Sequence, residues 1–392
     1  MVVRHKIARK LYDVVSNIRG APTPCRHLST ATASVLVEQE SDSSDKSIDA
    51  IESIVNRHFP EIKNFQKLGY FTRDNPQMYR YQPNTNGSAS LLRSQDLFHH
   101  GDYDQLPKQA RTIEELQNSL PFHFTDRDPT QTEMVGLGES YTKSDFLAYH
   151  VAVARHQMDP DEIDFLFQGP ILAVLATSSR VDKRTKYRVQ QIPRSKTIAV
   201  DCAKTYPRNP TDLGYQFERF VLGLPPYDPD AEDDDKDKGI THLQMATIHG
   251  SRVLLSATQD GIDQDGFGVE VKALKNLITG TETSLPFVPR RRWREIAWQM
   301  IGSGARTLYA GGKDEYDKAV VNVQRWSLDQ ILAIVMRDDD TMRSNLEASM
   351  ESLKQAQSEG LFENGRIYNL HFVGYDLELT LADDRLPWII QS

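Results

Sequence analysis

The chain has 392 residues, of which 39% are hydrophobic and 9% aromatic, enough to form a large hydrophobic core. Its two cysteines exclude a disulfide framework, and no stretch approaches the roughly 18 apolar residues of a membrane-spanning helix. The net charge of −9 gives no general attraction for nucleic acid, so an RNA site would have to be a local basic groove.

The N-terminal segment differs in composition from the rest of the chain. Residues 1–34 carry six lysines and arginines against one acid, Asp13, with apolar residues between the charges. We interpret this segment as a mitochondrial presequence that is removed after import, with a disordered basic arm as the alternative. The acidic, serine-rich residues 35–46 predict a linker, so the folded domain is expected over residues 47–392. The expected location is the mitochondrion, with the nucleus or cytoplasm as alternatives.

The following segments mix helical and strand patterns. Apolar residues at helical spacing predict helices over residues 47–59, 112–120, 211–222 and from 289 onward. Residues 165–176 and 197–200 predict buried strands or a strand that leads into a turn of helix, and further strands are predicted over 252–257, 269–274, 307–310, 319–323, 368–372 and 377–381. This order is mixed α/β without an internal repeat. The acidic run 228–237 lacks the ligand register of a calcium-binding loop, which favours a solvated loop.

A carboxylate and a Glu-x-Lys motif occur on consecutive predicted strands. Asp260 ends the first strand, and Glu270 and Lys272 lie on the second. Because side chains alternate along a strand, Glu270 and Lys272 share a face while Val271 points into the core. Carboxylates at such an edge can hold Mg²⁺ against a phosphodiester, and a nearby lysine can orient or deprotonate the attacking water. A solvated, salt-bridged strand face is the alternative.

Two predicted helices supply further candidates. The helix over 211–222 turns Phe217 to the core and places Glu218 next to it, with Gly214 one turn earlier leaving room for a ligand. Glu218 is therefore the candidate third carboxylate. On the helix that begins near residue 289, Gln299 lies at the margin of the buried stripe, where an ordinary surface amide is the alternative.

These motifs together resemble the decapping exoribonuclease (DXO) family, which includes the nuclear exoribonuclease-activating decapping proteins. That family has a Gly-Tyr-Lys-Phe-Glu helix, a Glu-x-Asp strand end, a Glu-Leu-Lys strand and a Trp-Ala-Gln helix. This chain has, in the same order, GYQFE (214–218), TQD (258–260), EVK (270–272) and AWQ (297–299). The segments GYFT (69–72), YRYQP (79–83) and AGGKD (310–314) extend the resemblance, which covers roughly residues 60–385.

The resemblance implies two twisted mixed β-sheets flanked by helices, with metal ions in a pocket between them. It also implies hydrolysis at RNA 5′ ends: decapping of incomplete or non-standard caps, release of pyrophosphate, or 5′→3′ exonuclease digestion. Carried over by position, Glu218, Asp260 and Glu270 would hold Mg²⁺ (or Mn²⁺), while Lys272 and Gln299 would contact the water or the scissile phosphate. The implied partners are RNA and a 5′→3′ exoribonuclease, without a membrane.

Two positions depart from the family pattern. Gln168, in FLFQGPIL, replaces an arginine that meets substrate phosphate, and an amide supplies neither the charge nor the fork of donors of a guanidinium. Thr258 replaces a glutamate, so one carboxylate is missing from the cluster. Asp263 and Asp265 in the adjoining turn are candidate substitutes.

A basic run at the start of the Gln299 helix could supply the missing positive charge. Its arginines are suited to RNA phosphate and its tryptophan to stacking on a base: Arg290, Arg291, Arg292, Trp293 and Arg294. The alternative is a solvated helix start with the tryptophan in the core. Three hypotheses remain: an active hydrolase, a catalytically impaired relative that binds RNA or a partner nuclease, and a protein that shares only the fold.

Overall fold

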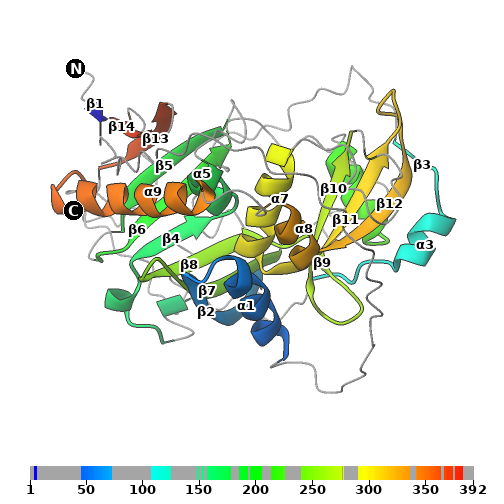
Figure 1. Ribbon diagram of the computed structural model, residues 1–392, viewed down its shortest axis with the longest axis horizontal. Helices are drawn as coiled ribbons and strands as arrows, with labels where there is room; N and C mark the ends of the chain where they lie inside the picture. Colours follow the sequence, from blue (N-terminus) through cyan, green and yellow to red (C-terminus); the bar gives the residue numbers. More distant parts are fainter. Residues whose placement is uncertain are drawn as a thin grey trace, which may run out of the picture.

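Figure 1 shows the computed structural model of the protein, in which helices pack between and against two β-sheets. The structure describes residues 4–6, 46–72, 107–124, 148–149, 152–153, 157–177, 185–192, 195–204, 213–225, 240–275, 277, 290–335, 341–362, 366–373 and 376–382. Most of the predicted presequence and linker, the acidic run 228–237 and the tyrosine motif 79–83 lie outside the described residues.

The first sheet has nine strands in the order β1-β14-β13-β5-β6-β4-β8-β7-β2. In chain order these strands are β1 (Arg4–Lys6), β2 (Ile62–Thr72), β4 (Phe165–Gln168), β5 (Thr185–Gln191), β6 (Ile198–Lys204), β7 (Ile240–Ile248), β8 (Ser251–Thr258), β13 (Tyr368–Val373) and β14 (Asp376–Leu381). The sheet is mixed, because β4 runs parallel to β6 and β8 while the other neighbours are antiparallel. β1 pairs with β14, so three residues of the predicted presequence form an edge strand.

The second sheet has five strands in the order β3-β12-β11-β10-β9. They are β3 (Phe122–His123), β9 (Gly261–Ile262), β10 (Gly268–Leu274), β11 (Ala305–Lys313) and β12 (Ala319–Ser327). β10 is parallel to β11, and the other pairings are antiparallel. The chain passes from the first sheet to the second between β8 and β9, at Gln259 and Asp260. Asp260 therefore lies where the two sheets meet.

Helices cover the sheets and fill the space between them. They are α1 (Lys46–His58), α3 (Ile113–Asn118), the 3₁₀ helix η3 (Pro160–Glu162), α5 (Ile171–Thr177), α6 (Leu213–Val221), α7 (Arg290–Ser303), α8 (Leu328–Val335) and α9 (Thr341–Ser358). In Figure 1, α7 lies between the sheets, and it contacts β8 of the first and β11 of the second. None of the described helices is long and apolar enough to cross a membrane.

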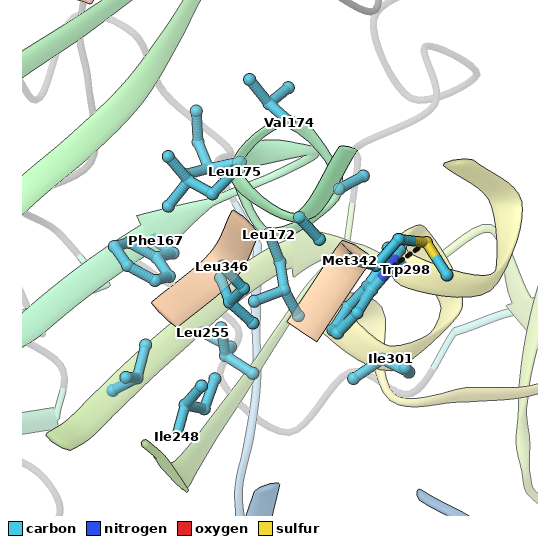
Figure 2. Close-up of a cluster of buried hydrophobic side chains, with 14 of the residues drawn as sticks. Phe167, Leu172, Val174, Leu175, Ile248, Leu255, Trp298, Ile301, Met342 and Leu346 are labelled. Atoms are coloured by element: carbon cyan, nitrogen blue, oxygen red, sulfur yellow. Dashed lines mark hydrogen bonds between the residues drawn. The ribbon is translucent and has the colours of Figure 1, made fainter. Parts of the chain in front are cut away.

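The largest hydrophobic cluster joins both sheets through α7. Figure 2 shows part of it, with Phe167 of β4, Leu255 of β8 and Trp298 of α7 among its side chains. The indole nitrogen of Trp298 donates to the sulfur of Met342 on α9 at 3.2 Å. Each fully buried side chain of this size contributes about 1.5–3 kcal/mol, so this cluster holds α7 in a fixed position between the sheets.

The structure confirms the predicted fold of two mixed sheets flanked by helices. Of the two alternatives for the segment 165–176, the structure shows a strand followed by a helix, because the apolar run is broken by Gly169 and Pro170. The strands are longer than predicted, as β11 extends over Ala305–Lys313 where the sequence indicated 307–310. Hydrogen bonds to neighbouring strands continue past the apolar residues from which the prediction was made.

Candidate active site

The alternation along β10 places its charged residues on one face. Val269 and Val271 belong to a hydrophobic cluster under α6, whereas Leu274 belongs to the main cluster around α7. Glu270 and Lys272 share the face of Leu274, since side chains of a strand alternate with a period of two. Both are withdrawn from solvent, with side-chain exposures of 8% for Glu270 and 21% for Lys272. The alternative of a solvated strand face is therefore wrong.

Asp260 reaches this pair across the junction of the sheets. Its Oδ2 atom accepts a hydrogen bond from the backbone N–H of Val271 at 2.7 Å, which fixes the carboxylate beside Glu270 and Lys272. The ammonium of Lys272 donates to Oε1 of Glu270. The structure thus brings Asp260, Glu270 and Lys272 together.

Burial and charge act on this group in opposite directions. Burial raises the pKa of Glu270 to about 7, with the Asp260 charge adding to the rise and Lys272 and Arg292 opposing it. Burial by itself lowers the pKa of Lys272, but the negative charges of Glu270 and Asp260 outweigh it, so that pKa is raised overall. In this structure Lys272 is therefore a hydrogen-bond donor to Glu270, and its contact with the water or the scissile phosphate stays a prediction.

The α7 helix contributes a second cation to the same group. The charge of Arg292 lowers the pKa of both Glu270 and Lys272, as the smallest of the contributions to each. The buried carboxylate of Glu295 accepts from Arg291 at 3.1 Å through Oε1 and from Arg292 at 3.1 Å through Oε2. Glu295 therefore orients Arg292, and the i, i+3 spacing of the two residues is the signal in the sequence that could have indicated this pairing.

The other residues of the basic run divide between surface and core. Arg291 is exposed, and Arg294 is half-buried. Trp293 is fully buried and meets Trp326 edge to face, with ring centroids 5.7 Å apart, so it belongs to the core and not to a base-stacking surface. Arg290 begins α7, and the direction of its side chain lies outside what the structure describes.

The two amides at predicted site positions are shielded from solvent to different degrees. Gln168 is buried at the end of β4, where it pairs in register with Ser256, four residues before Asp260. Gln299 is half-buried on α7, and its Oε1 atom makes no hydrogen bond among the described residues. Contact of Gln168 or Gln299 with substrate stays a prediction.

Glu218 lies on a helix that packs on the opposite face of β10. The neighbouring Phe217 belongs to the cluster of Val269 and Val271, and α6 contacts β10. Glu218 itself is half-buried. Its charge is not among those that shift the pKa of Glu270, which come from Lys272, Asp260 and Arg292. The part of the chain that the structure describes does not group Glu218 with Asp260 and Glu270, and its metal-binding role stays a prediction.

The turn between β9 and β10 contains a second buried carboxylate, Asp263. It is only 1% exposed and accepts four hydrogen bonds, from the backbone N–H groups of Asp265 and Phe267, the hydroxyl of Thr307 and the guanidinium of Arg325. Asp263 is therefore fully engaged in closing the turn and does not replace the carboxylate that is missing at Thr258.

Gln259 fixes the crossing of the chain between the sheets. Its Nε2 atom donates to the carbonyl of Ser303 at the end of α7, at 3.1 Å. Gly268 makes room for it, because a Cβ atom on Gly268 would lie 1.8 Å from that nitrogen. Behind Gln259 is a recess lined also by Lys67, Tyr70 and His242. Burial, with the charge of Lys67, lowers the pKa of His242 to about 3, so the imidazole is neutral.

The residues present fit a divalent ion held through two carboxylates. Among the described residues no group of three His, Cys, Asp or Glu side chains could hold an ion. One oxygen each of Asp260 and Glu270 is hydrogen-bonded, and the described residues provide no hydrogen bond to the other oxygen of either. Mg²⁺ is commonly bound through one or two carboxylates, with water and substrate phosphate completing its shell. Asp260 and Glu270 are the residues that would hold such an ion, and their binding of a metal stays a prediction.

Comparison with solved structures identifies the fold. S. pombe Rai1 matches with a TM-score of 0.55 and 14% sequence identity over 82% of this chain and 94% of its own. S. pombe Rai1 in complex with 3′-FADP gives a TM-score of 0.54, again with 14% identity and coverages of 82% and 94%. The chain has the Rai1 fold. The fold implied by the DXO resemblance is therefore confirmed. No known family and no curated protein matches the sequence itself.

Proposed function

We propose that this protein is a metal-dependent hydrolase that acts on RNA 5′ ends, by decapping, pyrophosphate release or 5′→3′ digestion. The observation that carries the proposal is the convergence of Asp260, Glu270 and Lys272 at the junction of two sheets in a Rai1 fold. The 3′-FADP complex of S. pombe Rai1 supports a nucleotide ligand for this fold.

Each charged group has a task in this proposal. Asp260 and Glu270 would hold Mg²⁺ or Mn²⁺, which when bound supplies charge stabilisation for the attacking and leaving oxygens. The Lys272 ammonium donates to a non-bridging oxygen of the scissile phosphate, and Arg292 offsets the charge that develops there. Water adds to phosphorus and gives up a proton to solvent, the bond to the leaving oxygen breaks, and that oxygen takes up a proton from solvent, so one water is consumed and no net proton is gained or lost. Gln299 is proposed to contact the water or phosphate.

The test is turnover of defined RNA 5′ ends. The purified chain with Mn²⁺ or Mg²⁺ should release a cap, pyrophosphate or nucleotides from 5′-modified RNA, and Glu270→Ala should abolish release. Full activity of that variant would refute the assignment of the site.

A second candidate is a catalytically impaired protein that binds RNA or a partner 5′→3′ exoribonuclease. Thr258 and Gln168, and the absence of a three-carboxylate group among the described residues, favour it. RNA or nuclease binding without metal-dependent turnover would support this candidate, and clear turnover would eliminate it.

Mitochondrial import remains a proposal from the N-terminal composition. Removal of residues 1–34 would also remove the edge strand β1. N-terminal sequencing of the protein from its own cells should find a start near residue 30, and an intact Met1 would contradict import with cleavage.

A further inference from the structure

The recess behind Gln259 contains buried polar atoms that make no hydrogen bond among the described residues. Nε2 of Gln259 donates to the Ser303 carbonyl, which leaves Oε1 as the amide atom without a partner there. The Nδ1 atom of His242 is likewise buried and unpaired among these residues. Both side chains line the recess, and Gln259 is 3% and His242 4% exposed. Because an unsatisfied polar group is costly to bury, the recess is suited to a ligand that bonds to both.

Lys67 brings a positive charge to the same recess. Its ammonium lies 4.5 Å from the centre of the Tyr70 ring, whose face attracts a cation but carries no net charge. None of the described residues that line the recess is acidic. His242 is neutral and adds no charge, because burial and Lys67 lower its pKa to about 3. A ligand for the recess should therefore be negatively charged.

Glycines shape the recess and the size limits what can enter it. A Cβ atom on Gly304 would lie 2.5 Å from the His242 ring, and one on Gly268 would lie 1.8 Å from Nε2 of Gln259. The recess has a volume of about 30 Å³. One water needs about 10–15 Å³, and a cavity that takes up benzene has about 150 Å³. The recess therefore accepts a small inorganic ion and excludes a nucleobase.

Inorganic phosphate combines the features that the recess requires. Near neutral pH it is an anion that still carries a hydroxyl group, so it can both accept from Lys67 and donate to a buried oxygen. We propose that the recess is a binding site for inorganic phosphate, held by the ammonium of Lys67 and by Oε1 of Gln259, which accepts from the phosphate hydroxyl. The Nδ1 atom of His242 bonds to a further phosphate oxygen.

This phosphate site is separate from the candidate active site. Asp260, Glu270 and Lys272 do not line the recess, so the inference does not depend on the proposed hydrolase. Gln259 directly precedes Asp260 at the crossing of the chain between the two sheets. Phosphate bonded to Gln259 would accordingly help to hold that crossing in place.

Sulfate is the matched control ligand, because it has a similar size and a negative charge but no hydroxyl group near neutral pH. The buried Oε1 atom of Gln259 would then face an oxygen that cannot donate to it. Sites that bond to a hydroxyl group discriminate strongly against an analogue without one, so sulfate should bind at least about tenfold more weakly than phosphate. Isothermal titration calorimetry of the full chain at pH 7, with EDTA present, measures both affinities.

Two lysine variants locate the binding site. Lys67→Gln removes the charge and should weaken phosphate binding by at least about tenfold, since a hydrogen bond between charged groups is lost. Lys63→Gln changes an exposed lysine on the same strand and should leave the affinity unchanged. Urea denaturation checks that both variants fold like the unmodified protein.

Phosphate could also enter the candidate active site, so the titration is repeated with Lys272→Gln. Binding that Lys272→Gln removes and Lys67→Gln leaves unchanged overturns the assignment to the recess. Equal affinities for phosphate and sulfate overturn the recognition of a hydroxyl group by Gln259, and the lack of saturable phosphate binding overturns the site altogether. Binding that prefers phosphate over sulfate and is weakened by Lys67→Gln alone supports the proposal.

Discussion

The turn that holds Asp263 and the strand that carries Glu270 bury their carboxylates to similar degrees, 1% and 6% exposed, but with different partners. Asp263 accepts four hydrogen bonds, two of them from the backbone of its own turn. Among the described residues, the Glu270 side chain has one hydrogen-bond partner, Lys272, and burial raises the pKa of Glu270 to about 7.

The difference shows which property of a buried carboxylate points to function. Burial alone does not, because Asp263 is the more buried of the two. A carboxylate that receives donors at both oxygens is stabilised and has no remaining capacity for a ligand, whereas one with a perturbed pKa and an oxygen available can hold an ion or a proton. Changes at the two positions should accordingly affect different measurements.

The largest expected effect is on activity at Glu270. Glu270→Gln should reduce RNA hydrolysis by about 10²–10³-fold, because the amide keeps the shape but loses the charge that would hold the ion. The variant should fold at least as stably, since a neutral amide costs less to bury than a carboxylate. Product release with Mn²⁺ and urea unfolding measure the two quantities, with the exposed Glu351→Gln as control. Activity near that of the unmodified protein would show that Glu270, like Asp263, is not needed for hydrolysis.

A loss of stability is expected at Asp263 instead. Asp263→Ala leaves four donors without their acceptor, which should lower the free energy of unfolding by about 2–4 kcal/mol. Asp265→Ala, two residues away and exposed, should change it by no more than about 0.5 kcal/mol. Urea denaturation of both variants provides the comparison, and equal midpoints would show that Asp263 does not secure the turn.

The third expected effect is a pH dependence of the free energy of unfolding that comes from Glu270. The pKa of Glu270 rises from 4.5 to about 7 on folding, so the native state retains a proton that the unfolded chain releases. The contribution of Glu270 to stability is therefore fully present below about pH 4.5 and is lost as the pH rises through about 7, by at most about 3 kcal/mol.

Chemical denaturation in EDTA at several pH values measures how the free energy of unfolding changes with pH when no metal is bound. Subtracting the same curve for Glu270→Gln should isolate the contribution of Glu270 to the free energy of unfolding, because the amide does not titrate over this range. If the two curves run parallel between pH 4.5 and 7, Glu270 titrates normally and the contrast with Asp263 is wrong.

The smallest expected effect concerns RNA affinity at α7. Arg292→Ala should weaken RNA binding by about tenfold and reduce the slope of log affinity against log salt by about 1, since one phosphate contact is lost. Arg291 bonds the same Glu295 but is 62% exposed, so Arg291→Ala should change the slope less. Filter binding at several salt concentrations measures these slopes. Identical slopes for Arg292→Ala and the unmodified protein would show that Arg292 does not contact RNA phosphate.

Much of the fold could be predicted from local patterns. The apolar run at 165–176 predicted a buried strand or a strand that leads into a helix, and its break at Gly169 and Pro170 explains the helix that forms. Thr112 caps α3 with the reciprocal bonds of a capping box. These features depend on neighbours a few residues away, so they can be found in the sequence. The order of the nine-stranded sheet could not, because it joins residues as distant as β1 and β14.

For the candidate site, the sequence by itself determined that Glu270 and Lys272 share one face of a strand, because alternation is a property of the strand alone. Only the tertiary structure decided what surrounds them. It placed Asp260 against the Val271 N–H, brought Arg292 in from α7 on Glu295, and packed the helix of Glu218 on the opposite face of β10. Charge and burial at a site depend on which elements pack together, and that packing is set by the whole core.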